Sequence, residues 1–283
     1  MKPLTGTDES RTTRLLVRRH SALVRVTHWV NVICMAVLLP SGLQIFNAHP
    51  RLYWGQYGAD PDRAAFEIGA AGEGETVKGF ARVGPVTLPT TGVLGVSGRR
   101  DGEALRAFPS WATLPAVQSL ADGRRWHFFF AWLFAFNGLA YLGHGVLSGH
   151  LRRDVLPSRD QVRPSHLLRE IADHARLRFP KGEAARRYNA LQRLAYLAVV
   201  AILLPVMVLT GLCMSPAINA AAPWLVDLFG GRQSARTLHF ISASLLVLFT
   251  LVHLAMVVLS GPWNNMRSMV TGRYAIRIAR AGS

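Results

Sequence analysis

Four long apolar stretches decide what this chain of 283 residues can fold into. None of them contains Asp, Glu, Lys or Arg, and each exceeds the roughly 20 mostly apolar residues that a helix needs to cross a bilayer. A backbone inside lipid must satisfy its own hydrogen bonds, which favours α-helices for such segments. The stretches are 26–50, 126–151, 194–226 and 237–266.

We therefore expect an all-α membrane protein, a bundle of four transmembrane helices with a long outer loop between the first and the second. The first span is not a cleavable signal peptide, because its apolar run is too long and no small-residue cleavage site follows it. The expected parts are a basic N-terminal segment (1–22), a membrane domain (23–260) with spans 23–46, 126–148, 191–214 and 237–260, an outer loop (47–123), an inner loop (149–189) and a basic tail (261–283).

The positive charge alternates from one connection to the next. Residues 1–25 hold six Lys and Arg against two acids, the 149–189 loop ten against five, and the 261–283 tail four against none. The 47–123 loop holds seven against eight. Basic loops remain on the cytoplasmic side of a membrane, so both termini are predicted to be cytoplasmic. This alternation accounts for the net charge of +16 without nucleic-acid binding, and the lipid bilayer is the expected surrounding.

Histidines are the polar residues that stand out inside the spans. Ionisable side chains are rare and costly in a bilayer, so each is a candidate functional residue. The alternative for any single one is a hydrogen bond to a neighbouring helix, but five of the ten histidines lie in the predicted spans. They are His28, His127, His144, His239 and His253.

The spacing on the last span places two histidines on one helix face at different depths. His239 and His253 are fourteen residues apart, which is about 40° from exact alignment and about 21 Å along a helix axis. Helix direction then selects their partners by depth. His127 pairs with His239 near the outer surface, and His28 pairs with His253 near the inner surface. The third span carries no histidine and is expected only to pack.

Two histidines at each of two levels favour haem over a metal held by protein alone. A zinc or non-haem iron site needs three or four ligands, often with a carboxylate, and no acid lies in any span. Bis-histidine haem needs only two axial ligands in a bundle core. His144 points to another face and could replace an inner ligand, bond a haem propionate or face quinone; we expect a role beside the ligands. Cationic candidates for the propionates are Arg124 and Arg125 outside, and Arg25, Arg152 and Arg153 inside.

Three motifs give the sequence a family resemblance. They are R-x-x-H-W (Arg25, His28, Trp29), R-W-H (Arg125 to His127) and the His-x13-His pair on the last span. The chain resembles the cytochrome b subunits of the prokaryotic cytochrome b561, nickel–iron hydrogenase, formate dehydrogenase and thiosulfate reductase superfamily. The resemblance implies a bacterial inner-membrane protein with two haem b groups on His28, His127, His239 and His253.

The resemblance also implies what the protein does. Family members pass electrons between the quinone pool and a redox subunit at the outer surface, of molybdopterin, iron–sulfur or hydrogenase type. The 47–123 loop departs from the compact family members by its length, and in this the chain looks closer to members paired with molybdopterin oxidoreductases. We expect an electron-transfer subunit rather than a complete enzyme. The alternatives are a stand-alone oxidoreductase that passes electrons from superoxide to quinone, and a haem-free transporter or scaffold.

Overall fold

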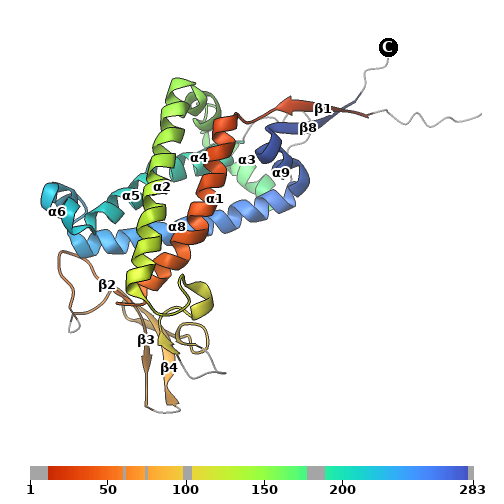
Figure 1. Cartoon of the computed structure of the whole chain (residues 1–283). Coiled ribbons are helices and arrows are strands. Elements are labelled where there is room, and N and C mark those ends of the chain that lie inside the picture. Colours follow the sequence, from red (N-terminus) through yellow and green to blue (C-terminus); the bar gives the residue numbers. More distant parts are fainter. Residues whose placement is uncertain (1–11, 60–61, 74–75, 98–103, 177–188, 280–283) are drawn as a thin grey trace, which may run out of the picture. The chain divides into compact units, whose positions relative to one another are not determined.

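Four helices in the described part of the chain are long and apolar enough to cross a membrane (Figure 1). The computed structural model describes residues 12–59, 62–73, 76–97, 104–176 and 189–279. Many large apolar side chains on these helices, such as Phe129, Phe136 and Leu139, are exposed, as expected where lipid covers them. The four helical segments are α1 (Ala22–Phe46), α2 (Leu120–Leu147), Ala190–Cys213 and α8 (Arg232–Leu259).

Two of these helices begin earlier than the sequence predicts, because polar residues form their first turns. α2 begins at Leu120, where the Ser119 hydroxyl accepts a hydrogen bond from the Asp122 amide. α8 begins at Arg232, whose amide donates to Gln56 Oε1 at 2.9 Å. The spans were predicted from stretches without charged residues, so first turns that contain charged residues fell outside them.

The third membrane segment is interrupted before its proline. It consists of α4 (Ala190–Ala198), a π-helical turn η5 (Val199–Leu203) and α5 (Leu204–Cys213). Pro205 has no amide hydrogen to donate to the preceding turn, and π turns are common where such a helix adjusts. Two short helices, α6 (Pro216–Ala221) and α7 (Pro223–Leu228), then lead to α8.

The chain forms two compact units, and every membrane helix contributes residues to both. Unit 1 comprises 1–28, 141–198 and 249–283, whereas unit 2 comprises 29–140 and 199–248. Each unit is described by itself below.

Unit 2 contains a small β domain in place of most of the predicted outer loop. Four antiparallel strands lie in the order β2–β3–β4–β5, of which β2, β3 and β4 are labelled in Figure 1. Strands β6 and β7 form a separate pair. The prediction of an all-α chain is therefore wrong for this loop, where alternating apolar residues and Gly- or Pro-containing turns make strands. The strands are β2 (Arg51–Leu52), β3 (Phe66–Ala71), β4 (Lys78–Val83), β5 (Val86–Pro89), β6 (Gly95–Ser97) and β7 (Ala104–Arg106).

The β domain is anchored on the end of α1 by an apolar core and a buried arginine. Phe46 of α1 packs in one core with Leu52 and Ile68 of the strands. Arg106 of β7 donates to Gln44 Oε1 at 2.9 Å and to Thr113 Oγ1 at 3.0 Å. Burial lowers the pKa of the Arg106 guanidinium. These contacts hold the β domain close to the residues that support the histidines of unit 2.

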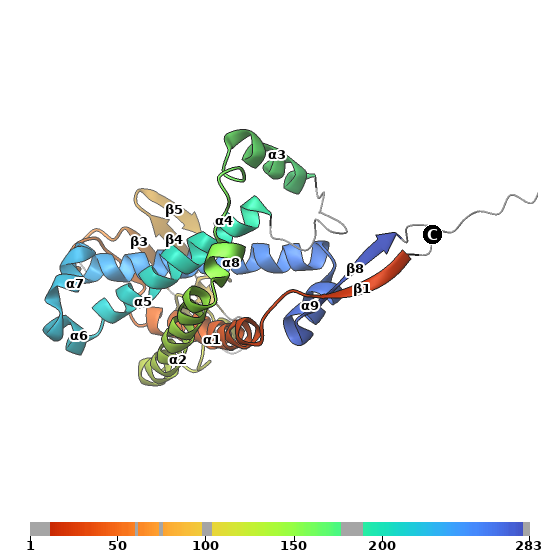
Figure 2. The ribbon, with the colours of Figure 1, turned by 90° about the horizontal axis from the view of Figure 1, so that it is seen from above.

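Unit 1 brings together the two ends of the described chain. Strand β1 (Thr12–Arg18) pairs antiparallel with β8 (Arg273–Ala279), and α9 (Pro262–Thr271) lies beside them (Figure 2). Unit 1 also contains η3 (Leu151–Val155) and α3 (Pro164–Ala175) from the predicted inner loop. The sequence treatment of 1–22 and 261–283 as basic tails missed this strand pairing, whereas residues 1–11, 177–188 and 280–283 lie outside the described part.

Two adjacent glycines before α8 give a matched test of this architecture. Both have positive φ, but a Cβ on Gly231 would lie 2.5 Å from the Gly55 carbonyl oxygen, whereas one on Gly230 meets nothing closer than 3.7 Å. We expect Gly230→Ala to cost about 1 kcal/mol from backbone strain alone, and Gly231→Ala to cost at least about 2 kcal/mol more. Unfolding of the detergent-solubilised variants measures this difference. Equal costs would show that the contact between 55–56 and the start of α8 is not formed.

Candidate metal centres

The membrane helices bring four of the five predicted histidines together as two pairs of nearly equal geometry. In unit 1 the ring centroids of His28 and His253 are 6.4 Å apart, with ring planes 63° to each other. In unit 2 the centroids of His127 and His239 are 6.3 Å apart at 64°. The pairing by depth predicted from the sequence is therefore the pairing found in the structure.

The spacing within each pair suits two imidazoles that bind one metal ion from opposite sides. With metal–nitrogen bonds of about 2.0 Å, the ring centres of two such imidazoles lie roughly 6.2 Å apart. The described residues contain no group of three or more His, Cys, Asp or Glu side chains that could enclose a metal ion. Each pair therefore offers two ligands only, which fits haem, whose porphyrin supplies the remaining ligands.

Hydroxyl groups hold both histidines of unit 2 from neighbouring helices. Ser41 of α1 lies with its Oγ 3.1 Å from His127 Nδ1. Thr210 of α5 lies with its Oγ1 3.1 Å from His239 Nδ1. Both hydroxyl residues are completely buried. The two histidines thus have the same kind of partner at the same ring nitrogen.

These hydroxyls select one tautomer of each ring. Ser41 donates its hydrogen to the Val37 carbonyl at 2.7 Å, and Thr210 donates to the Val206 carbonyl at 2.6 Å. The Leu38 carbonyl also lies 3.2 Å from His127 Nδ1 and can only accept, so His127 carries its proton on Nδ1. Because Thr210 gives its one hydrogen to Val206, its oxygen accepts from His239 Nδ1 in the same way. The lone pair on Nε2 is left for a metal, and the hydrogen bond fixes the ring orientation.

A glycine follows each hydroxyl residue and makes room for the ring. A Cβ on Gly42 would lie 3.3 Å from His127 Cε1, and a Cβ on Gly211 would lie 3.3 Å from His239 Cε1. Ser-Gly on α1 and Thr-Gly on α5 therefore form equivalent supports. The expectation that the third membrane segment only packs is incomplete, because α5 orients a candidate ligand.

The pair in unit 1 has different neighbours. The ring of Phe249 stacks against His253 at 5.9 Å and 17°, one turn earlier on α8. His144, the fifth predicted histidine, lies with Nε2 3.4 Å from Ser21 Oγ at the start of α1. The structure therefore places His144 in unit 1 with a polar neighbour of its own, and its role beside the ligands stays a prediction.

Three of the four paired histidines follow an arginine by three residues. Arg25 precedes His28, Arg124 precedes His127 and Arg236 precedes His239. Arg25 donates to the Val270 carbonyl, but its Nε is buried without a hydrogen-bond partner among the described residues.

Two predicted arginines, Arg124 and Arg125, are more exposed than Arg236, which was not predicted. Arg124 is exposed over the Phe128 ring, and Arg125 is exposed with Asp122 at 3.2 Å. Sequence reasoning missed Arg236, which is half-buried and donates to the backbone carbonyls of His49 and Arg51. The spacing R-x-x-H, which Arg236 and His239 share with Arg25 and His28, could have identified Arg236 from the sequence.

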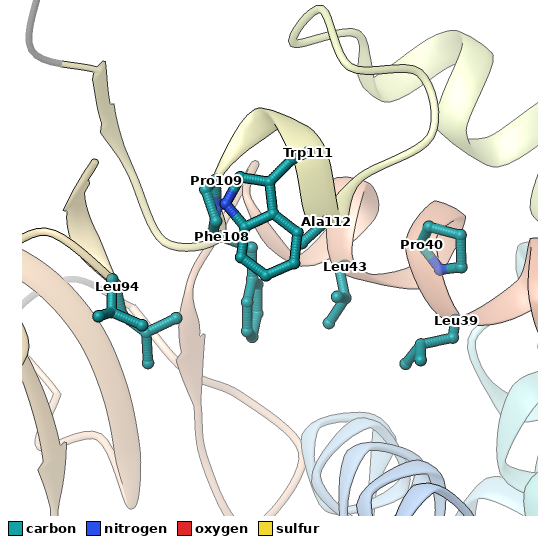
Figure 3. Close-up of a pocket in the computed structure, with 9 residues that line it drawn as sticks. Leu39, Pro40, Leu43, Leu94, Phe108, Pro109, Trp111 and Ala112 are labelled. Atoms are coloured by element: carbon teal, nitrogen blue, oxygen red, sulfur yellow. The ribbon is translucent and has the colours of Figure 1, made fainter. Parts of the chain in front are cut away.

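An apolar pocket of about 360 Å³ lies beside the Ser41 support (Figure 3). Leu39, Pro40 and Leu43 of α1 line one side, and Phe108 and Trp111 line the other. A quinone site needs polar groups that fix the headgroup as well as apolar walls. The lining is almost wholly apolar, so this pocket alone does not provide such a site.

Comparison with known proteins agrees with this geometry. The sequence matches the family described as prokaryotic cytochrome b561 over residues 19–272. The "Putative protein-methionine-sulfoxide reductase subunit YedZ1" of Azospira oryzae is 29% identical over 240 residues, covering 85% of this chain and 90% of that protein. No solved structure matches the chain.

Because the family match covers most of its length, the chain belongs to the prokaryotic cytochrome b561 family. It is a membrane electron-transfer protein of the b-type cytochrome class, and the family binds haem b. The predicted family is thereby confirmed.

The hydroxyl supports generate a prediction for the redox potential of the group that His127 and His239 would bind. A hydrogen bond from Nδ1 makes an imidazole more electron-rich and stabilises ferric iron. Ser41→Ala or Thr210→Val should therefore raise one midpoint potential by about 40 mV, equivalent to about 1 kcal/mol for one electron. Spectroelectrochemical titration measures this shift.

The matched control is Ser244→Ala, which removes an exposed hydroxyl from α8, the helix that carries His239. We expect this variant to keep the wild-type potentials. Unchanged potentials in all three variants would contradict the proposed role of the supports.

Proposed function

We propose that the chain is a two-haem electron-transfer subunit that connects the quinone pool with a periplasmic reductase, in the inner membrane of a bacterium. The observation that carries this proposal is the pair of histidine sites with equal ring spacing, both using ligands from α8. One haem b per site would give the membrane domain two redox centres along one helix.

The chain's own residues would hold and orient each haem. His28 with His253 would hold one haem, and His127 with His239 would hold the other. Arg25 and Arg236, each about one helical turn before a ligand, would face the propionates, and Arg124 is a further candidate. The Nε of Arg25 is buried without a hydrogen-bond partner in the described part of the chain, which supports this role, since an anion there would satisfy it. Bound haem b supplies a reversible one-electron couple between ferric and ferrous iron.

The β domain supports a partner at the periplasmic side. It belongs to the same unit as His127 and His239 and contacts the start of α8 through Thr237 and Tyr53, at 2.6 Å. We place the partner there and quinol oxidation at the side of His28 and His253. This arrangement puts the paired strands β1 and β8, and hence both termini, in the cytoplasm, in agreement with the distribution of positive charge.

The relative's name suggests the partner's reaction. Reduction of a methionine sulfoxide to methionine and water consumes two electrons and two protons. Oxidation of one quinol to quinone releases the same number of each. We therefore propose electron flow from quinol through the His28–His253 site and the His127–His239 site to a molybdopterin reductase of this kind.

Haem content tests the two sites separately. We expect two haem b per chain in the wild type by pyridine haemochrome assay. Alanine at either member of one pair should remove one haem, because each site has its own ligands. The absorption spectrum of the haem at the other pair should be unchanged. His166→Ala on α3 is the matched control and should retain both haems. Loss of no haem from any paired-histidine variant would contradict the assignment and favour a haem-free transporter or scaffold.

Stopped-flow reduction by a short-chain quinol tests the direction. His253→Ala should abolish reduction by quinol, whereas His239→Ala should leave the remaining haem reducible but unable to pass electrons to the reductase. Dithionite reduction provides the control for haem competence. The reverse pattern would contradict the proposed polarity. Superoxide-driven quinone reduction by the isolated chain would instead support a stand-alone oxidoreductase.

A further inference from the structure

Helix α9 turns its polar residues toward the protein. Asn264 Nδ2 donates to the Ala275 carbonyl of β8, and Asn264 Oδ1 accepts from the Ala275 amide, both at 2.9 Å. Asn265 Nδ2 donates to Ser260 Oγ at 2.9 Å, and Ser268 is 2% exposed. These polar side chains of α9 are therefore hydrogen-bonded or buried within unit 1.

The opposite side of α9 is exposed and carries three large apolar residues, with Arg267 and Thr271 beside them. Trp263, Met266 and Val270 are spaced by three and four residues, so they form one stripe. Trp263 is 88% exposed and Val270 58%. A helix at an aqueous surface has the reverse arrangement, with its apolar side turned to the core. The stripe therefore requires an apolar surrounding that the chain itself does not supply.

The position of α9 in the chain identifies that surrounding. Helix α8 ends at Leu259, with Val258 and Leu259 exposed, and α9 begins at Pro262 after a turn in which Gly261 has a φ of 110°. A helix that starts three residues after a bilayer-crossing helix starts at the membrane surface. Tryptophan is enriched at that interface, where Trp263 would lie.

The neighbouring strands β1 and β8 place arginines at directly opposite positions. In the β1–β8 pair, Arg18 is directly opposite Arg273, and both side chains are exposed. The register also sets Arg14 opposite Arg277. Neither strand contains an acid. Like charges directly opposite each other destabilise a strand pair, so this ribbon favours an anion close to it.

We propose that α9 and the β1–β8 ribbon form a binding site for anionic phospholipid on the cytoplasmic leaflet. The stripe of Trp263, Met266 and Val270 inserts among the upper acyl chains, and Arg18, Arg273 and Arg267 bind headgroup phosphates. The continuity of α9 with a membrane span selects lipid over a soluble partner, and the exposed arginines, on strands that contain no acid, select an anionic headgroup over a zwitterionic one. The site does not depend on bound haem.

A spin label tests whether the stripe is inserted. Cys34 and Cys213 are fully buried, so Met266→Cys provides a single accessible thiol in the full-length chain. In phosphatidylglycerol nanodiscs, the label should be relaxed by oxygen and protected from a water-soluble nickel complex. The control is Glu73→Cys in the exposed part of the β domain, which should show the opposite accessibility. A water-accessible label at position 266 would overturn the proposal.

Lipid selectivity tests the arginines. The variant Arg18→Gln/Arg273→Gln and the control Arg159→Gln/Arg169→Gln each remove two exposed positive charges from segments proposed to be cytoplasmic. Phosphatidylglycerol retained relative to phosphatidylcholine is measured by native mass spectrometry of the purified proteins. We expect the ribbon variant to lose about fivefold per arginine and the control to lose less.

Equal losses in the two double variants would overturn the specific site and leave only general surface charge. The haem spectrum of each variant is recorded in parallel and should be unchanged. Loss of lipid selectivity with intact haem supports the lipid site alone, whereas wild-type protein without haem would contradict the proposed function and leave the lipid site standing.

Discussion

The hydrogen bond between a buried hydroxyl and an imidazole is the interaction on which the candidate centre of unit 2 depends. An imidazole inside a membrane needs a partner for its N–H, and a charged partner would be costly there. Ser41 and Thr210 provide a neutral one, and their own hydrogens are already committed to helix carbonyls. The outcome is that His127 and His239 are held with Nε2 available. This need for a hydrogen-bond partner explains why α1 and α5 both contribute to the centre of unit 2, although neither provides a ligand to it.

Much of the membrane architecture could be predicted from the sequence, because bilayer thickness sets a minimum apolar length and helix geometry sets rotation. The pairing of His28 with His253 and of His127 with His239 followed from depth on antiparallel helices. The supports could not be predicted in this way. Ser and Thr are common in helices, and only the three-dimensional approach of α1 to α2, and of α5 to α8, distinguishes Ser41 and Thr210 from other hydroxyl residues.

Apart from short β-like runs that the sequence shows in residues 83–97, the strands of the β domain and the β1–β8 ribbon were missed for a different reason. Their strands are short or lie at the ends of the chain, so charge runs and Gly-rich composition concealed them. Ile68 and Leu52 alternate with polar neighbours over only a few residues, which is too short for a periodic signal. The structure changes the meaning of these segments. A predicted loop becomes a domain anchored on α1 by Phe46 and Arg106, and two predicted basic tails become a paired ribbon beside α9.

The central claim is that two sites each present two histidines to one iron. Near-infrared magnetic circular dichroism of the oxidised, purified protein tests it most directly, because this spectrum identifies the axial ligands of ferric haem. The account predicts bis-imidazole ligation at two haems per chain. A single haem, or a haem with one histidine ligand or with an axial ligand other than histidine, would contradict it.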